Sequence, residues 1–170
     1  MKNIVLTGFM GTGKTEVGKE LAQIRGLKLI DLDTEIEKSE KMTINEIFKQ
    51  FGEQKFRDIE SEMIEKLSRE RNVIISTGGG AVLKQQNMDI LKKTGIVICF
   101  MATPETILQR TGNSDNRPLL MVDNPLEKIR ELLEFRRPFY EKADLMIDTE
   151  DKTPRQIAEE IIDQIRNSKL

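Results

Sequence analysis

The stretch Ile4–Thr15, I-V-L-T-G-F-M-G-T-G-K-T, sets a glycine-rich turn between a short apolar run and the start of a helical pattern. Glycine adopts backbone conformations that a side chain would block, so successive N–H groups of such a turn can point at phosphate oxygens. The helix start adds unpaired N–H groups and a positive dipole end. Lys14 supplies a charge for the β- and γ-phosphates, and Thr15 supplies a hydroxyl for a phosphate-bound Mg²⁺. This context predicts a loop that binds a nucleoside triphosphate.

Length and charge limit what the nucleotide can be used for. The chain has 170 residues, enough for one domain with a single core, and a formal net charge of −2 at pH 7. It lacks a dense basic stripe, so we do not expect a nucleic-acid partner. It also lacks an apolar run of membrane-spanning length and a cleavable apolar leader, so we expect no membrane partner.

The rare residue types indicate the compartment and the chemistry. Cys99 is the only cysteine and lies in an apolar run, so we expect a buried core residue and a cytoplasmic, reducing location. Histidine is absent, and acid–base chemistry must therefore rely on carboxylates.

Short apolar runs alternate with helical patterns along the chain. We expect five strands, each rich in Ile, Val or Leu, at residues 3–7, 27–31, 72–76, 95–101 and 145–148. Helix starts are indicated by a cap residue before proline at 103–104, 124–125 and 153–154, and by a capping box at 43–46. This alternation predicts an α/β fold, a five-stranded parallel sheet with helices on both faces. Ligands of such sheets gather at the carboxyl ends of the strands.

The second strand ends in two carboxylates, Asp31 and Asp33, which would point the same way in extended chain. One interpretation places Asp31 near Mg²⁺, directly or through water, and makes Asp33 the proton acceptor for an incoming hydroxyl. The other makes Asp33 the cap of a helix that begins at Thr34. The sequence around the pair leaves both interpretations open.

The third strand runs into three consecutive glycines, Gly78–Gly80. Such a run is costly in an ordered chain unless the backbone passes close to something, and we expect a ligand there; a plain flexible turn is the alternative. Ser76 and Thr77 stand where nucleotide hydrolases carry an acidic residue. Transfer to a bound alcohol is therefore favoured over activation of water.

Three arginines are candidates for binding anions. Arg57 has Glu60 one helical turn later, which could hold the guanidinium in place, although a solvated salt bridge has the same spacing. Arg136 lies near the end of a predicted helix, beside Arg137, so at least one of the two is a generic surface charge. Arg117 lies in the polar stretch 112–124, which we expect to be a mobile loop, and it could swing onto the transferring phosphate.

Together these motifs resemble the shikimate kinase family, small P-loop kinases similar in fold to nucleoside monophosphate kinases. Five segments carry the resemblance in order, at residues 8–15, 31–37, 52–60, 77–81, and 117–120 with 136–140. Other small-molecule kinases share the phosphate loop but not two aspartates followed by F-R-x-x-E. The resemblance implies a three-layer architecture in one kinase domain, residues 1–170, with a substrate-binding segment at 32–60 and a mobile lid at 112–124.

The implied reaction is transfer of the ATP γ-phosphoryl group to the 3-hydroxyl of shikimate, giving shikimate 3-phosphate and ADP on the chorismate route to aromatic amino acids. The resemblance assigns catalysis to Lys14, Asp33 and Arg117, with Mg²⁺ held by Thr15 and Asp31. It assigns ATP binding to Gly11, Thr12, Gly13, Lys14, Thr15, Glu16, Arg110, Arg117 and Lys152. It assigns shikimate binding to Asp33, Phe48, Phe56, Arg57, Glu60, Gly78, Gly79, Gly80 and Arg136.

Within these sets, Arg57 and Arg136 match the arginines that grip the substrate carboxylate, and Arg110 matches one that lies against adenine. Glu16 departs from the family pattern, which has Ser or Thr after the lysine–hydroxyl pair. Its carboxylate would repel the triphosphate unless it turns away or pairs with Lys19. Two other functions stay open: a kinase acting on gluconate or a nucleoside monophosphate, and a nucleotide-binding module without catalysis. A monomer is the simpler expectation, since lid and substrate segment must move.

Overall fold

A single parallel sheet organises the molecule. The computed structural model describes residues 2–112, 120 and 122–168. Its strands are β1 (Asn3–Gly8), β2 (Lys28–Asp31), β3 (Val73–Ser76), β4 (Gly95–Met101) and β5 (Leu145–Asp148). They pair in the order β2-β3-β1-β4-β5, every pair parallel, with β1 at the centre. The predicted five-stranded parallel sheet is confirmed.

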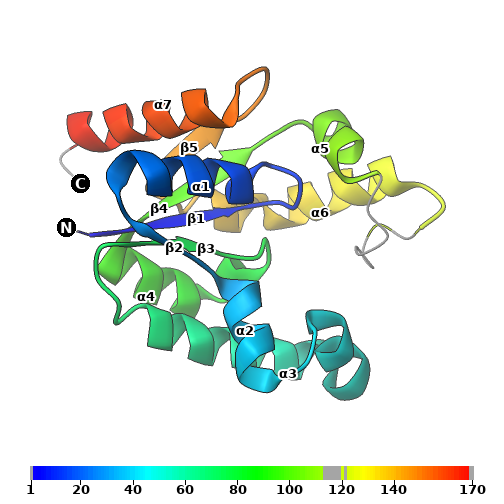
Figure 1. Ribbon diagram of the computed structural model, residues 1–170. Helices are drawn as coiled ribbons and strands as arrows, with labels where there is room; N and C mark the ends of the chain where they lie inside the picture. The colour runs from blue at the N-terminus through cyan, green and yellow to red at the C-terminus, as the bar shows by residue number, and fades with distance from the viewer. Residues whose placement is uncertain (1, 113–119, 121, 169–170) are drawn as a thin grey trace.

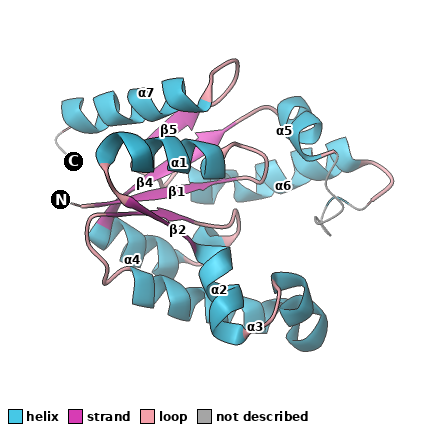
Figure 2. Ribbon diagram, viewed as in Figure 1, coloured by secondary structure: helices cyan, strands magenta, loops and turns pink. Residues whose placement is uncertain are grey.

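Helices cover both faces of the sheet (Figures 1 and 2). They are α1 (Lys14–Arg25), α2 (Leu32–Glu40), α3 (Ile44–Leu67), α4 (Gln85–Thr94), α5 (Pro104–Thr111), α6 (Pro125–Tyr140) and α7 (Pro154–Asn167), with a short 3₁₀ helix, η1 (Ala81–Leu83). α1 and α7 pack on one face through an apolar cluster that includes Leu6, Leu21 and Ile161. α3, α4 and α6 contribute to a second cluster on the other face.

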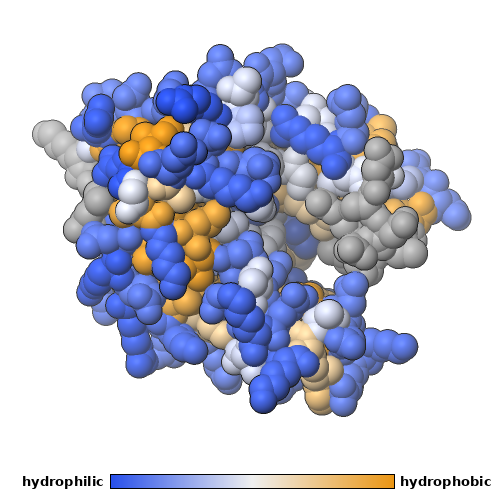
Figure 3. Space-filling view, viewed as in Figure 1, coloured by the Kyte–Doolittle hydropathy of each residue, from blue (hydrophilic) through white to orange (hydrophobic). Residues whose placement is uncertain are grey.

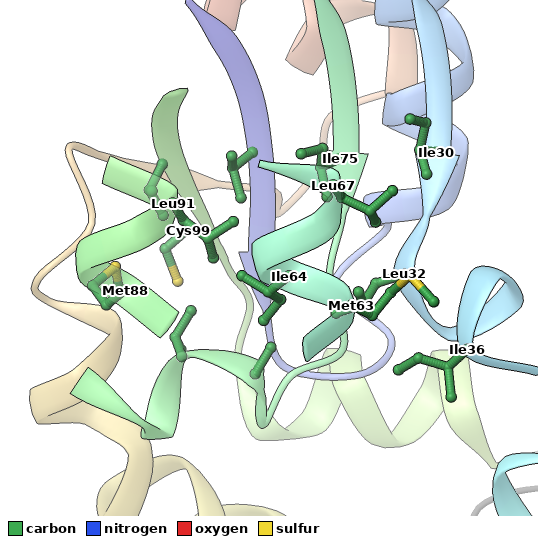
Figure 4. Packing of buried hydrophobic residues seen from close by; sticks show 14 of the residues in the cluster. Ile30, Leu32, Ile36, Met63, Ile64, Leu67, Ile75, Met88, Leu91 and Cys99 are labelled. Carbon is green, nitrogen blue, oxygen red and sulfur yellow. The ribbon is translucent and has the colours of Figure 1, made fainter. Parts of the chain in front are cut away.

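The second cluster is the larger one and extends towards the carboxyl ends of the strands. Figure 4 shows Met63 of α3 beside Leu32 of α2, and Leu91 of α4 beside Cys99 of β4, with Ile64 of α3 between the two groups. Cys99 is fully buried, as predicted, and burial raises the pKa of its thiol to about 12. The thiol is therefore a packing group at neutral pH.

Local capping signals fix most helix starts. Thr103, Asn124 and Thr153 are the caps of α5, α6 and α7, each followed by proline. Thr43 and Glu46 form the predicted capping box at the start of α3. Within α3, Gly52 has φ 79° and ψ 174°, so a kink separates the first turns from the long segment that follows.

The end of β2 differs from the extended chain that the sequence predicted. The strand ends at Asp31 and α2 begins at once at Leu32, with Asp31 as its cap: Asp31 Oδ1 accepts from Thr34 N at 2.9 Å. The interpretation that Asp33 caps this helix was therefore wrong, because Asp31 is the cap. Leu32 is fully buried, so apolar packing draws the helix start two residues earlier than the pattern indicated.

The strands all point towards one side of the molecule, so their carboxyl ends meet there (Figure 1). On that side the surface is hollowed between the part formed by α2 and α3 and the part formed by α5 and α6 (Figure 3). Within the described part of the chain, every helix is too short or too polar to cross a membrane.

Candidate active site

The phosphate loop joins the central strand to α1. Gly8 has φ 130°, and a Cβ there would lie 2.5 Å from the Phe100 carbonyl oxygen, so the loop needs glycine where it leaves the sheet. Gly13 precedes α1, whose first residue is Lys14. The Lys14 ammonium donates to the carbonyl oxygens of Gly8 and Phe9, at 2.7 and 2.8 Å. The lysine thus lies over the loop, where the resemblance requires it.

The Gly78–Gly80 turn after β3 is close to the side chains of the site. A Cβ at Gly78 would lie 3.3 Å from Asp33 Oδ1, and one at Gly80 would lie 2.7 Å from Arg57 Cζ. A Cβ at Gly79 would lie 3.0 Å from the Gly8 carbonyl oxygen. The glycines let the turn fit between the phosphate loop and these side chains. The backbone of this turn does pass close to other groups, as predicted. Those groups are side chains and backbone of the protein itself.

Asp33 lies in the first turn of α2 beside this turn. Burial, with the charge of Asp31, raises the pKa of Asp33 from 3.8 to about 6, although Lys14 opposes the shift. Its Oδ1 is buried and has no hydrogen-bond partner in the described part of the chain. An unsatisfied buried carboxylate oxygen near Lys14 suits a group that accepts from a bound hydroxyl.

Arg57 is held by a buried carboxylate. Its Nη1 lies 2.7 Å from Glu60 Oε2, and the Glu60 side chain is 1% exposed. Burial raises the pKa of Glu60, while the Arg57 charge lowers it. The guanidinium also lies 5.1 Å from the centroid of the buried Phe56 ring. The predicted i,i+3 contact is present, and it is far from a solvated salt bridge.

A cavity of about 350 Å³ lies beside Arg57 and is lined in part by Glu60, Gly80 and Lys84. Phe48 packs on Phe56 with ring centroids 4.6 Å apart, and its side chain is partly exposed. The two rings thus lie together in the segment 32–60 that we predicted to bind the substrate.

Arg136 is the buried member of the arginine pair on α6. Arg136 as a whole is 5% exposed, whereas the side chain of Arg137 is 63% exposed. Its Cζ lies 5.3 Å from the centroid of the Phe9 ring in the phosphate loop. Its Nε is buried without a hydrogen-bond partner among the described residues. A buried guanidinium with an unsatisfied N–H favours an anionic ligand.

The two residues predicted to lie near adenine, Arg110 and Lys152, are found at the segment that follows β5. Arg110 donates to Thr149 Oγ1 and to the Thr149 carbonyl oxygen, each at 3.2 Å, so α5 is tied to the loop after β5. Lys152, in the same loop, pairs with Glu160 of α7 at 2.8 Å. Arg110 Nη1 also donates to the Gly11 carbonyl oxygen at 3.4 Å, so Arg110 lies beside the phosphate loop. Arg117 and most of the predicted lid, 113–119 and 121, lie outside the described residues.

Glu16 pairs with Lys19 at 2.8 Å, and both side chains are 61% exposed. The pairing that would reduce repulsion of the triphosphate is therefore present.

We predict that Glu16→Thr lowers the KM for ATP by roughly two-fold at low ionic strength, because the exposed carboxylate still opposes the phosphates and salt screens it. Measuring KM at low and high salt checks this, with Glu20→Gln on the same helix as the control. An equal or higher KM for the Glu16→Thr protein contradicts it.

Two residues of the site were not assigned a role from the sequence. Phe9 lies within the phosphate-loop motif, and Tyr140 closes the R-R-P-F-Y segment. The spacing of Tyr140 four residues after Arg136 was the available signal, because such residues share a helix face.

Comparison with known proteins identifies the family. The model of the family described as shikimate kinase matches residues 10–166. The shikimate kinase of Thermodesulfovibrio yellowstonii is 54% identical over 95% of this chain and 94% of its own length. That of Thermoanaerobacter pseudethanolicus is 53% identical over 95% of each chain.

Solved structures agree with the sequences. Shikimate kinase from Acinetobacter baumannii, in complex with shikimate, matches with a TM-score of 0.95 at 41% identity, over 100% of this chain and 96% of that one. Shikimate kinase from Aquifex aeolicus matches with a TM-score of 0.86 at 35% identity, over 97% and 96%. The chain therefore belongs to the shikimate kinase family.

Proposed function

We propose that this chain transfers the γ-phosphoryl group of ATP to the 3-hydroxyl of shikimate, giving shikimate 3-phosphate and ADP. The observation that carries the proposal is the meeting of Asp33, Arg57 and Arg136 at the Gly78–Gly80 turn, beside the phosphate loop. One carboxylate and two buried or half-buried guanidinium groups suit an acceptor that carries a hydroxyl and a carboxylate. The solved relative that binds shikimate supports this choice.

The acceptor is bound through its carboxylate. Arg57 and Arg136 approach the glycine turn from α3 and α6, and each offers planar N–H groups that match a carboxylate. Phe56, with Phe48 packed on it, supplies the apolar surface for a carbon ring. These contacts align the hydroxyl rather than react with it.

The transfer step uses Asp33 and the loop. The acceptor oxygen forms a bond to the γ-phosphorus while the bond from that phosphorus to the β–γ bridging oxygen breaks, and the hydroxyl proton goes to the Asp33 carboxylate. Lys14 and the N–H groups of residues 11–15 neutralise charge on the phosphates. We assign the same task to Arg117 on the motif alone, with the 112–124 lid excluding water.

Thr15 and Asp31 would hold Mg²⁺, which when bound neutralises phosphate charge. Hydroxyl and carboxylate oxygens are the donors that Mg²⁺ prefers, and kinases bind it through few protein groups. Asp31 ends β2 at the edge of the sheet from which the phosphate loop leaves β1, which supports this role. We further propose a cytoplasmic location, consistent with the unpaired, buried Cys99. We also propose a monomer, since the predicted lid and substrate segment must move.

The direct test is release of ADP by the purified protein with Mg²⁺ and ATP, using shikimate, gluconate or nucleoside monophosphates as acceptors. Only shikimate should raise the rate above the acceptor-free background, and phosphorus NMR should detect one new phosphomonoester. Shikimate-dependent release no higher than background would refute the proposed function.

We predict an acid limb in the pH profile with an apparent pKa near 6. A base must be ionised to accept a proton, and the Asp33 pKa is raised to about 6, so its active form is lost as pH falls below that value. At saturating ATP, kcat/KM for shikimate should drop about ten-fold per pH unit below the limb. A profile that stays flat down to pH 5, in protein shown by circular dichroism to be folded, would exclude this base.

A further inference from the structure

The guanidinium of Arg136 lies among three other groups of the protein. The Phe9 ring lies 5.3 Å from its Cζ, and the backbone of Gly79 passes beside Nη1, since a Cβ there would lie 3.2 Å from that atom. The third group is Tyr140, one helical turn later on α6. A Cβ at Gly79 would lie 3.3 Å from the Tyr140 hydroxyl oxygen, so Arg136 and Tyr140 converge on the same glycine.

Tyr140 uses its hydroxyl in this cluster. The residue is 1% exposed, and its hydroxyl donates to the Gly79 carbonyl oxygen at 2.8 Å. Burial raises the pKa of Tyr140 to about 12, against the lowering effect of the Arg136 charge, so the hydroxyl stays a donor at neutral pH. A phenylalanine would fill the same apolar space, but it would leave the Gly79 carbonyl without this donor.

We propose that Tyr140 is a positioning residue, which fixes the Gly79 turn against α6 and thereby holds Arg136 towards the carboxylate of the acceptor before the acceptor binds. The inference rests on the proposed function, because it takes Arg136 as a ligand of that carboxylate. Because Tyr140 is buried and its hydroxyl donates to the Gly79 carbonyl oxygen, we assign it no contact with the reacting hydroxyl or the phosphates. Its effect should therefore fall on acceptor binding rather than on the chemical step.

Tyr140→Phe tests this, because it removes one oxygen and keeps the ring. The KM for shikimate should rise about five-fold, as expected for one lost hydrogen bond, while kcat and the KM for ATP stay within two-fold. Ser68→Ala is the matched control: Ser68 is also buried and its hydroxyl donates to the Glu65 carbonyl oxygen, at the far end of α3. The control should lower the melting temperature without changing either KM.

A double-mutant cycle separates positioning from a general loss of packing. If Tyr140 acts through Arg136, adding Tyr140→Phe to an Arg136→Met protein should change kcat/KM for shikimate by less than two-fold. A full five-fold further loss in that background overturns the proposal, as does an unchanged KM for shikimate in the single Tyr140→Phe variant.

A second variant and a parallel assay of the wild type complete the test of Tyr140. Should Tyr140→Phe fail to fold, Gly79→Ala takes its place in the same cycle, because its methyl would lie 3.2 Å from Arg136 Nη1 and 3.3 Å from the Tyr140 hydroxyl oxygen. That methyl would also lie 3.0 Å from the Gly8 carbonyl oxygen, so an effect counts for the proposal only if the KM for ATP stays within two-fold, and a KM for ATP that rises as much as the KM for shikimate counts against it. The unmodified protein is assayed in parallel. Failure of the wild type to use shikimate refutes the proposed function, whereas an active wild type with an unaffected variant refutes only the role of Tyr140.

Discussion

Replacing Asp33 by asparagine is expected to lower kcat by about 10²–10⁴-fold, the usual contribution of a general base. The amide keeps the shape of the side chain and can still contact a bound hydroxyl, so the KM for shikimate should change much less than kcat. The acid limb near pH 6 should vanish from the residual activity, because the group that titrates is gone. Steady-state kinetics between pH 5 and 8 check both expectations.

The same substitution should stabilise the fold at neutral pH. The folded pKa of Asp33, about 6, lies above the ordinary value of 3.8, so its contribution to stability is fully present below pH 3.8 and is lost as the pH rises through 6. A shift of that size corresponds to roughly 3 kcal/mol at pH 8. Asparagine carries no charge to bury, so the free energy of unfolding should rise relative to wild type at pH 8 and differ little at pH 4.

Glu35→Gln is the control for this pair of effects. Glu35 is a partly exposed neighbour on α2 that pairs with Lys38 at 2.7 Å, and loss of its charge should leave kcat unchanged. A kcat for Asp33→Asn within ten-fold of wild type would exclude Asp33 as the base. If the Asp33→Asn protein were less stable than wild type at pH 8, the ionised Asp33 carboxylate would have to be stabilised by its surroundings, and the predicted cost of burying its charge would be wrong.

The sheet and the helix starts were predictable because their signals are local. A strand buried on both faces reads as an uninterrupted run of Ile, Val and Leu, and β4 matches the predicted 95–101. Caps such as Thr153 act on the backbone three residues away, so the sequence contains both partners. The phosphate loop was predictable for the same reason, since its glycines, Lys14 and the helix start are contiguous.

Features that depend on distant segments were not predictable in the same way. The end of β2 is decided by the burial of Leu32 in the core, which a local pattern of two aspartates does not reveal. The position of Gly79 beside Tyr140 joins residues 61 positions apart, so the hydroxyl of Tyr140 has no visible partner in the sequence. The resemblance supplied the roles of Arg57 and Arg136 and assigned the glycine turn to the same substrate site, whereas the contact of each side chain with a particular glycine emerged only from the fold.

Arg57 has two roles, and replacing it should reveal both. Arg57→Met is expected to raise the KM for shikimate by on the order of 10²-fold, because a buried charged contact to the acceptor carboxylate is lost. It should also reduce the free energy of unfolding by about 3–5 kcal/mol at pH 8, because the Glu60 carboxylate, 1% exposed, loses its partner at 2.7 Å. The Arg57–Glu53 pair, at 3.5 Å with Glu53 68% exposed, contributes little to either effect.

The pH dependence identifies Glu60 as the source of the instability. Burial already raises the pKa of Glu60, and removal of Arg57 takes away the main group that lowers it. A carboxyl whose folded pKa exceeds its unfolded value contributes stability at low pH and loses it as the pH rises. The deficit of Arg57→Met should therefore be small at pH 4 and grow towards pH 8, as followed by urea unfolding.

The double variant Arg57→Met/Glu60→Gln separates the two roles of the guanidinium. A neutral amide at position 60 removes the unpaired buried charge, so most of the stability at pH 8 should return. The KM for shikimate should stay high, because the group that binds the acceptor carboxylate is still missing. Recovery of shikimate binding together with stability would mean that Arg57 acts only as a structural partner of Glu60, and it would leave Arg136 as the carboxylate ligand on which the site depends.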